Sequence, residues 1–70
     1  MTTKDLTPQQ ADQWVVQEFA KCPTPASVRE RLASELNTER MAREYGLDAA
    51  FPNSARARRD LIQALREAAA

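Results

Sequence analysis

Histidine is absent from this chain of 70 residues, and glycine, cysteine, tryptophan and tyrosine occur once each. Without histidine, Cys22 and the serines lack the usual general base, and a zinc site lacks its commonest nitrogen ligand. A single cysteine excludes an internal disulfide, and Gly46 alone cannot form a glycine-rich phosphate loop. The acidic residues are spread along the chain, as solvated helix faces require. We therefore expect a protein that is not an enzyme and has no cofactor, metal or small-molecule substrate.

The chain also lacks net charge and long apolar segments. Ten basic and ten acidic residues cancel, so no overall field attracts nucleic acid or anionic lipid. No apolar run approaches the roughly 20 residues of a membrane span, and the polar start, Met1 to Thr7, has no signal-peptide core. These absences favour a cytosolic protein in which Cys22 is a structural thiol.

Threonine followed by proline is the clearest positive signal, at Thr7-Pro8 and at Thr24-Pro25. Threonine caps a helix through its hydroxyl, and proline at the first helical position lacks an N–H that would go unbonded. The first pair predicts a helix from Pro8 to about Lys21, and the second predicts a helix from Pro25.

The apolar pattern after Pro25 changes phase near Asn37. Because later apolar residues would lie opposite the earlier stripe on one continuous helix, we expect a new helix to begin at Asn37 or Thr38. Gly46 is expected to end it in a left-handed conformation. The next residues, 48–53, are typical of a loop or a single tight turn, with Pro52 stopping any helix before it.

The last predicted helix begins with a cap at Asn53 or Ser54 and reaches toward Ala69. No segment alternates with a period of two, so we expect no sheet. The fold class predicted is all-α, a compact bundle of about four short helices forming one small domain over residues 1–70, with residues 1–6 as a flexible lead-in.

Large apolar residues that could form a core are few for a chain of this length. Their burial alone does not offset the entropy of ordering the backbone, so a homodimer or another partner would relieve the shortage. The core candidates are Trp14, Val15, Phe19, Val28, Leu32, Leu36, Met41, Tyr45, Leu47, Phe51, Leu61, Ile62 and Leu65.

Arginines crowd the start of the last helix, where the helix dipole disfavours cations. Arg56, Arg59 and Arg66 fall within an arc of about 80° on the outer face and are candidates for a docking stripe. The alternative is local pairing, since Asp60 follows Arg56 by four residues. Arg58 projects over the apolar face, where an ion pair with Glu18 on the first helix would satisfy both charges.

Trp14 and Val16 lie at opposite edges of a wide apolar arc on the first helix. A single tryptophan is either the largest residue of the core or an interface anchor. The width of the arc keeps an interface on this helix open, so both residues are candidate partner contacts.

Residues Met41 to Leu47 resemble the first helix and turn of a helix-turn-helix, with the small residue Ala42 four places before Gly46. The standard short turn is broken, because Pro52 falls where the second helix would be running. A variant with a long turn would place Arg56 and Arg59 at the start of a recognition helix.

Two hypotheses for function therefore remain. We favour a small protein–protein interaction module that acts as a regulator, inhibitor or assembly subunit through the exposed faces of the first and last helices, binding another protein or itself. The alternative is a DNA-binding transcriptional regulator. The alanine- and arginine-rich composition is compatible with a bacterial or phage source.

Overall fold

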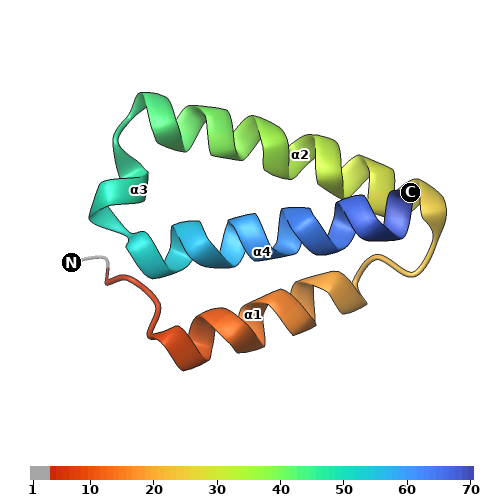
Figure 1. Cartoon of the computed structure of the whole chain (residues 1–70), viewed down its shortest axis with the longest axis horizontal. Coiled ribbons are helices and arrows are strands. Elements are labelled where there is room, and N and C mark those ends of the chain that lie inside the picture. Colours follow the sequence, from red (N-terminus) through yellow and green to blue (C-terminus); the bar gives the residue numbers. More distant parts are fainter. Residues whose placement is uncertain (1–3) are drawn as a thin grey trace.

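Helices make up most of residues 4–70, the part of the chain that the computed structural model describes, and no strand occurs within it. This confirms the all-α class and the small bundle of four helices (Figure 1). The expected flexibility of residues 1–3, part of the predicted lead-in, lies outside the described residues. The helices are α1 (Pro8–Ala20), α2 (Pro25–Glu44), α3 (Leu47–Ala50) and α4 (Pro52–Ala69).

Threonine side chains close the first turns of α1 and α2, as predicted. Thr7 Oγ1 accepts a hydrogen bond from the Gln10 N–H at 3.1 Å, and Gln10 Oε1 accepts one from the Thr7 N–H at 3.0 Å. Thr24 and Ser27 form the same reciprocal pair at the start of α2. Two otherwise unbonded donors are therefore satisfied at each of these helix starts.

The predicted break near Asn37 is wrong, because α2 runs without interruption from Pro25 to Glu44. Asn37 costs an interior helical position only about 0.5 kcal/mol relative to alanine, and no proline or glycine interrupts this stretch. Its side chain is used within the helix, where Asn37 Oδ1 accepts a hydrogen bond from Arg40 Nη2 at 2.7 Å. The change of apolar phase marks a change in what surrounds the helix and leaves its backbone continuous.

Gly46 follows α2 in the left-handed region, with a φ of 68°, as the sequence predicts. A residue with a β-carbon would be strained there even though nothing lies within 4 Å of the position a β-carbon would take. The next four residues form the single turn α3, which redirects the chain into α4.

The predicted cap of the last helix is also wrong. Helix α4 begins at Pro52, which occupies its first turn, and the residue at the cap position is Phe51, whose side chain accepts no hydrogen bond. Asn53 and Ser54 lie inside the helix, so their N–H groups need an acceptor from another part of the chain. That acceptor comes from the segment before α1.

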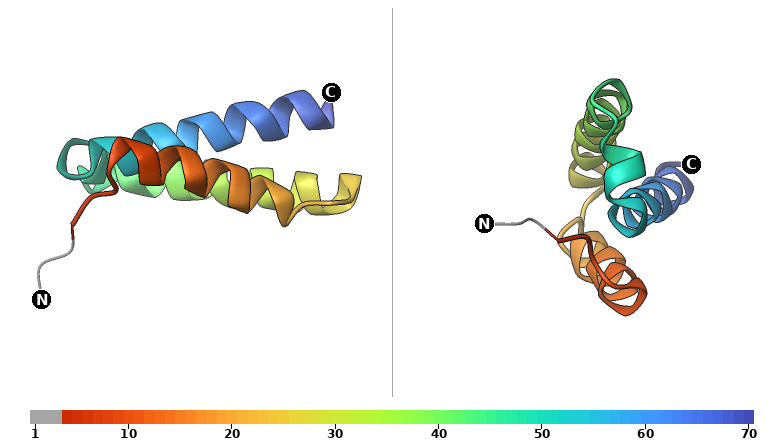
Figure 2. Two further views of the ribbon diagram at one scale, coloured as in Figure 1. Left: turned by 90° about the horizontal axis from the view of Figure 1, so that it is seen from below. Right: turned by 90° about the vertical axis from the view of Figure 1, so that its left-hand side faces the viewer.

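Helix α4 is the central helix of the bundle, because α1 and α2 both pack against it but not against each other. Figure 1 shows α4 between α1 and α2, and the end-on view in Figure 2 shows the three helices arranged as a triangle. Leu61 and Leu65 of α4 are fully buried, and Ala11 of α1 and Ala57 of α4 are as well. The core around the two leucines contains buried Cys22 and Val28 and the half-buried Trp14, Val15, Phe19 and Leu32.

Four of the thirteen core candidates lie at the surface. Leu36, Met41, Tyr45 and Leu47 are exposed. Met41 lies on the second half of α2, Tyr45 directly follows that helix and Leu47 begins α3, all beyond the part of α2 that faces the leucines of α4. The apolar phase after Asn37 therefore belongs to a surface.

Ion pairs connect α1 to α2 where their backbones do not meet. Glu18 of α1 accepts hydrogen bonds from Lys21 Nζ and from Arg31 Nη2 of α2, each at 2.7 Å, and Arg31 Nε donates to Glu35 Oε1 at 2.7 Å. The hydrogen bonds from Lys21 and Arg31 hold the pKa of Glu18 below its ordinary value, and those to Glu18 and Glu35 raise the pKa of Arg31. The predicted Glu18–Arg58 pair is wrong, since Arg58 binds Asp48.

We expect Leu61→Ala to lower the free energy of unfolding by about 2–5 kcal/mol. Truncation of this buried side chain leaves a cavity that the surrounding helices can fill only in part. That loss is comparable to the whole stability of a typical 70-residue domain. Leu36→Ala, at a residue 38% exposed, is the matched control and should cost less than about 1 kcal/mol. Urea unfolding followed by circular dichroism measures both, and equal losses would contradict the assignment of the core.

A double-mutant cycle on Glu18→Gln and Arg31→Gln should give a coupling energy of about 1–2 kcal/mol, because this pair is half-buried and links two helices. The control cycle uses Glu39→Gln and Arg43→Gln, an ion pair within α2 whose Arg43 is exposed. There we expect about 0.3–0.5 kcal/mol. Equal couplings in the two cycles would show that the α1–α2 ion pair adds nothing beyond a surface pair.

Candidate functional site

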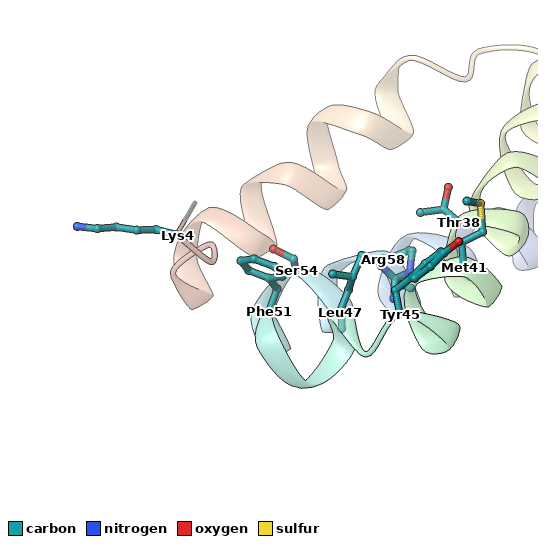
Figure 3. Close-up of a pocket in the computed structure, with 10 residues that line it drawn as sticks. Lys4, Thr38, Met41, Tyr45, Leu47, Phe51, Ser54 and Arg58 are labelled. Carbon is teal, nitrogen blue, oxygen red and sulfur yellow. The ribbon is translucent and has the colours of Figure 1, made fainter. Parts of the chain in front are cut away.

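An open groove lies where the second half of α2, the turn α3 and the start of α4 meet. Its volume is about 540 Å³, within the usual range for sites that hold a ligand or a few side chains of a partner. Figure 3 shows the labelled side chains around it. The lining residues are Lys4, Thr38, Met41, Ala42, Tyr45, Leu47, Phe51, Ser54, Ala55 and Arg58.

Large apolar side chains surround this groove and remain in contact with water. Tyr45 is 71% exposed, Met41 is 46% exposed and Leu47 is 45% exposed. The other exposed large apolar residues of the described chain, Val16 and Leu36, do not line it. Clustered exposure of this kind marks an interaction surface more often than scattered single residues do.

The α2 side of the groove has a regular spacing. Thr38, Met41, Ala42 and Tyr45 follow one another at i, i+3, i+4 and i+7, which places them on one face of the helix. Among the described helices, α2 packs only against α4 and α3. Ala42 is buried where α2 packs on its neighbours, whereas Thr38, Met41 and Tyr45 on the same face stay exposed.

Arg58 contributes a buried positive charge from the α4 side. The residue is 9% exposed, and its Nη2 donates a hydrogen bond to Asp48 Oδ1 of α3. Its Nε is buried and has no acceptor among residues 4–70. A buried donor without a partner costs about 1–3 kcal/mol, so this guanidinium is incompletely satisfied within the described chain.

The segment before α1 closes the start of α4 next to the groove. Asp5 Oδ2 accepts a hydrogen bond from the Asn53 N–H at 2.8 Å, and Asp5 Oδ1 accepts from the Ser54 N–H at 2.9 Å and from Ser54 Oγ at 2.7 Å. Asp5 thus supplies the cap that Phe51 cannot, and its negative charge lies at the positive end of the helix dipole.

The capping geometry also sets the acidity of Asp5. Partial burial by itself raises the pKa of this carboxyl. The hydrogen bonds from the Ser54 hydroxyl and from the N–H groups of Asn53, Ser54 and Leu6 lower the pKa, and together they outweigh the effect of burial. The net result is a pKa below the ordinary value. A carboxylate with this pKa is charged at neutral pH and holds the segment before α1 against α4.

A smaller hollow of about 360 Å³ adjoins the groove and shares Thr38, Ser54 and Arg58 with it. Its other lining residues are Leu6, Trp14 and Glu35. Trp14 is half-buried, packs against the leucine core and also lines this hollow. It therefore has one side in the core and one side at a surface.

The structure separates the arginines that the sequence groups together. Arg56 Nη1 is 3.1 Å from Asp12 Oδ1 and 2.9 Å from Asp60 Oδ2, and Arg56 Nη2 donates to the Pro8 carbonyl. Arg56 thus joins α4 to α1 and matches the local-pairing alternative. Arg59 and Arg66 are exposed and form no ion pair within residues 4–70.

Val16 is 70% exposed on α1 and lies beside a shallow depression with Asp12, Gln13 and Gln17. It is a single apolar residue among polar neighbours. The predicted partner contacts therefore do not form one surface: Val16 lies on α1, Trp14 lies at the core, and Arg59 and Arg66 lie on the exposed side of α4.

Sequence reasoning missed Met41, Tyr45 and Leu47 as site residues because it assigned them to the core. The signal that could have found them was the phase break itself. A stripe that leaves the core-facing side of a helix must face either a second core or solvent, and a chain with so few large apolar residues has no second core.

The described residues also contain no cluster of three or more histidine, cysteine, aspartate or glutamate side chains suited to hold a metal ion. None of the helices seen in residues 4–70 combines the length and the apolarity needed to cross a bilayer. Comparisons with protein-family models, with curated proteins and with solved structures find no match. Function is therefore inferred from the geometry of the groove.

We expect Asp5→Ala to lower the midpoint of thermal unfolding at pH 7, because Asn53 and Ser54 lose their acceptor. Unfolded Asp5 titrates near pH 4, and its folded pKa is lower. The charged cap therefore stabilises the fold above about pH 4, and this contribution disappears as the pH falls through the folded pKa. The difference in the midpoint of thermal unfolding between wild type and Asp5→Ala should accordingly become smaller below pH 4.

Circular dichroism at 222 nm, recorded on heating between pH 2.5 and 7, measures this gap. Asp5→Asn is the matched control, since it keeps an acceptor oxygen but does not titrate, and it should lose less stability at pH 7 than Asp5→Ala. A gap between wild type and Asp5→Ala that is the same at pH 3 and pH 7 would contradict a role for the charge.

Proposed function

We propose that this chain is a small, non-enzymatic protein–protein interaction module. The observation that supports the proposal is the groove, where Met41, Tyr45 and Leu47 are exposed together beside the buried Arg58. Burying those three side chains on a partner would be worth several kcal/mol of apolar transfer, at about 25 cal/mol per Å². Binding through this surface would make the chain a regulator, an inhibitor or an assembly subunit in the cytosol.

The proposed interface is the groove, whereas the sequence analysis expected exposed faces of the first and last helices. Faces on α1 and α4, represented by Val16 and by Arg59 with Arg66, offer one isolated apolar residue and two solvated cations. The groove offers three clustered apolar side chains and a cation. Affinity in protein interfaces usually depends on a few clustered apolar or aromatic anchors, and Tyr45 is of this type.

DNA binding through α4 is the competing hypothesis. Arg56 is paired with Asp12 and Asp60, and Arg58 is buried, so Arg59 is the only arginine of the first two turns of α4 that is exposed and unpaired within residues 4–70. A recognition helix needs several donors at this end to reach bases and phosphates. We therefore treat nucleic acid as an outcome that the experiment must detect.

The test is affinity capture of the tagged chain from its source lysate, with and without nuclease, in three forms. Wild type should retain a stoichiometric protein that survives nuclease. Tyr45→Asp should lose that protein, because a charge in the groove would have to be buried on binding. Val16→Asp, at a residue of almost equal exposure on α1, should retain it.

Other outcomes would overturn the proposal in identifiable ways. Loss of the protein in Val16→Asp with retention in Tyr45→Asp would place the interface on α1. Recovery of nucleic acid alone, abolished by Arg59→Glu with Arg66→Glu and weakened steeply by salt, would establish the DNA binder.

A further inference from the structure

The shape of the groove indicates what kind of segment it accommodates. Thr38, Met41 and Tyr45 form an exposed stripe with helical spacing along α2, and the buried Ala42 and Ala55 lie beneath it at the base of the groove. Seven residues of helix extend about 10 Å, which matches two turns of a second helix lying alongside. An apolar helix face of this kind is covered most effectively by the apolar face of another helix.

The charge in the groove indicates one further property of that segment. The lining residues include two cations, Lys4 and Arg58, and no carboxylate. In Figure 3 the Lys4 side chain extends away from the other labelled residues, so Arg58 is the cation within the groove. An acidic group from a partner would face Arg58, whose carboxylate partner within the chain, Asp48, does not line the groove.

Two carboxylates of the chain lie near Arg58 without satisfying it fully. Asp48 on α3 accepts from Nη2. Glu35 on α2 lines the adjoining hollow, but its carboxylate accepts from Arg31. The Nε has no acceptor among residues 4–70 but is closed to solvent, so a partner's carboxylate would approach the 11% of the Arg58 side chain that stays exposed. Guanidinium groups bind carboxylates more strongly than neutral acceptors, and a second carboxylate would add to the one that Asp48 supplies.

We propose that the groove binds an amphipathic helix of a partner protein that carries two apolar anchors about one turn apart and an aspartate or glutamate paired with Arg58. This inference rests on the proposed function and adds the chemistry of the partner. The apolar anchors fill the space beside Met41, Tyr45 and Leu47, and the acidic side chain sets the register of the helix along the groove.

The first experiment selects helical peptides that bind the groove. A phage library of 16-residue helical peptides, randomised at i, i+3, i+4 and i+7 on a background rich in alanine and glutamine, is selected on the immobilised chain. We expect the enriched peptides to carry two apolar residues and one aspartate or glutamate among these positions. Enrichment of apolar residues without an acidic residue would overturn the inference about Arg58.

The second experiment measures the acidic contact directly. An enriched peptide and its Glu→Gln or Asp→Asn counterpart are titrated against the wild-type chain by fluorescence anisotropy. A charge-assisted hydrogen bond predicts binding about 10-fold to 100-fold weaker for the neutral peptide. Equal dissociation constants would overturn the proposal, and this comparison requires no substitution in the chain.

The third experiment assigns the contact to Arg58. The double variant Arg58→Met with Asp48→Asn removes both members of the buried pair, so that neither charge is left alone. The acidic and neutral peptides should then bind it with equal affinity. If the variant does not fold, as judged by circular dichroism, the peptide comparison on the wild-type chain decides the matter.

Failure of this inference can be told apart from failure of the proposed function. Peptides that lose binding in Tyr45→Asp but show no preference for an acidic residue would leave the groove as the interface and reject the role of Arg58. Peptides that bind Tyr45→Asp as well as wild type, or a library with no enriched peptide, would reject the groove itself. Val16→Asp should bind every enriched peptide with unchanged affinity.

Discussion

Burial of Leu61 and Leu65 on α4 is the interaction on which the rest of the structure depends. Among residues 4–70 these are the two large side chains with no solvent contact, and α1 and α2 reach the core by packing against the helix that carries them. The backbones of α1 and α2 approach α4 but not each other, so α4 carries most of the packing that holds them in one domain. Polar contacts supply what the small core does not: the Glu18–Arg31 pair links α1 to α2, and Arg56 links α4 to α1.

A central helix with a neighbour on either side leaves other helix faces uncovered, and this creates the groove. The first half of α2 faces the leucines, whereas the second half presents Met41 and Tyr45 to solvent beside α3. The domain has too few large apolar residues for a second core there. The same shortage that limits stability therefore leaves an apolar surface for binding, which physically connects the size of the domain to the proposed function.

Sequence reasoning predicted the elements with strong local chemistry and missed those that depend on distant contacts. The starts of α1 and α2 and the left-handed Gly46 depend on residues within four positions of one another, and all three were predicted correctly. The predicted start of α4 was wrong because the residue that caps this helix is Asp5, almost fifty residues away in the sequence. The predicted pairing of Arg58 with Glu18 was wrong because α3 places Asp48 next to Arg58. Met41, Tyr45 and Leu47 of the groove were recognised as apolar, but their assignment to the core was wrong.

The amino-acid sequence by itself determined the all-α class, the two threonine-capped helix starts and the inventory that lacks histidine and phosphate loops, because each of these follows from residue type or from neighbours one turn away. Tertiary structure alone decided which apolar stripe became core and which became surface, which carboxylate caps α4 and which arginine is paired. Those outcomes depend on which helix faces meet in space. A change of apolar phase along one continuous helix does not encode whether the second face will meet a neighbour.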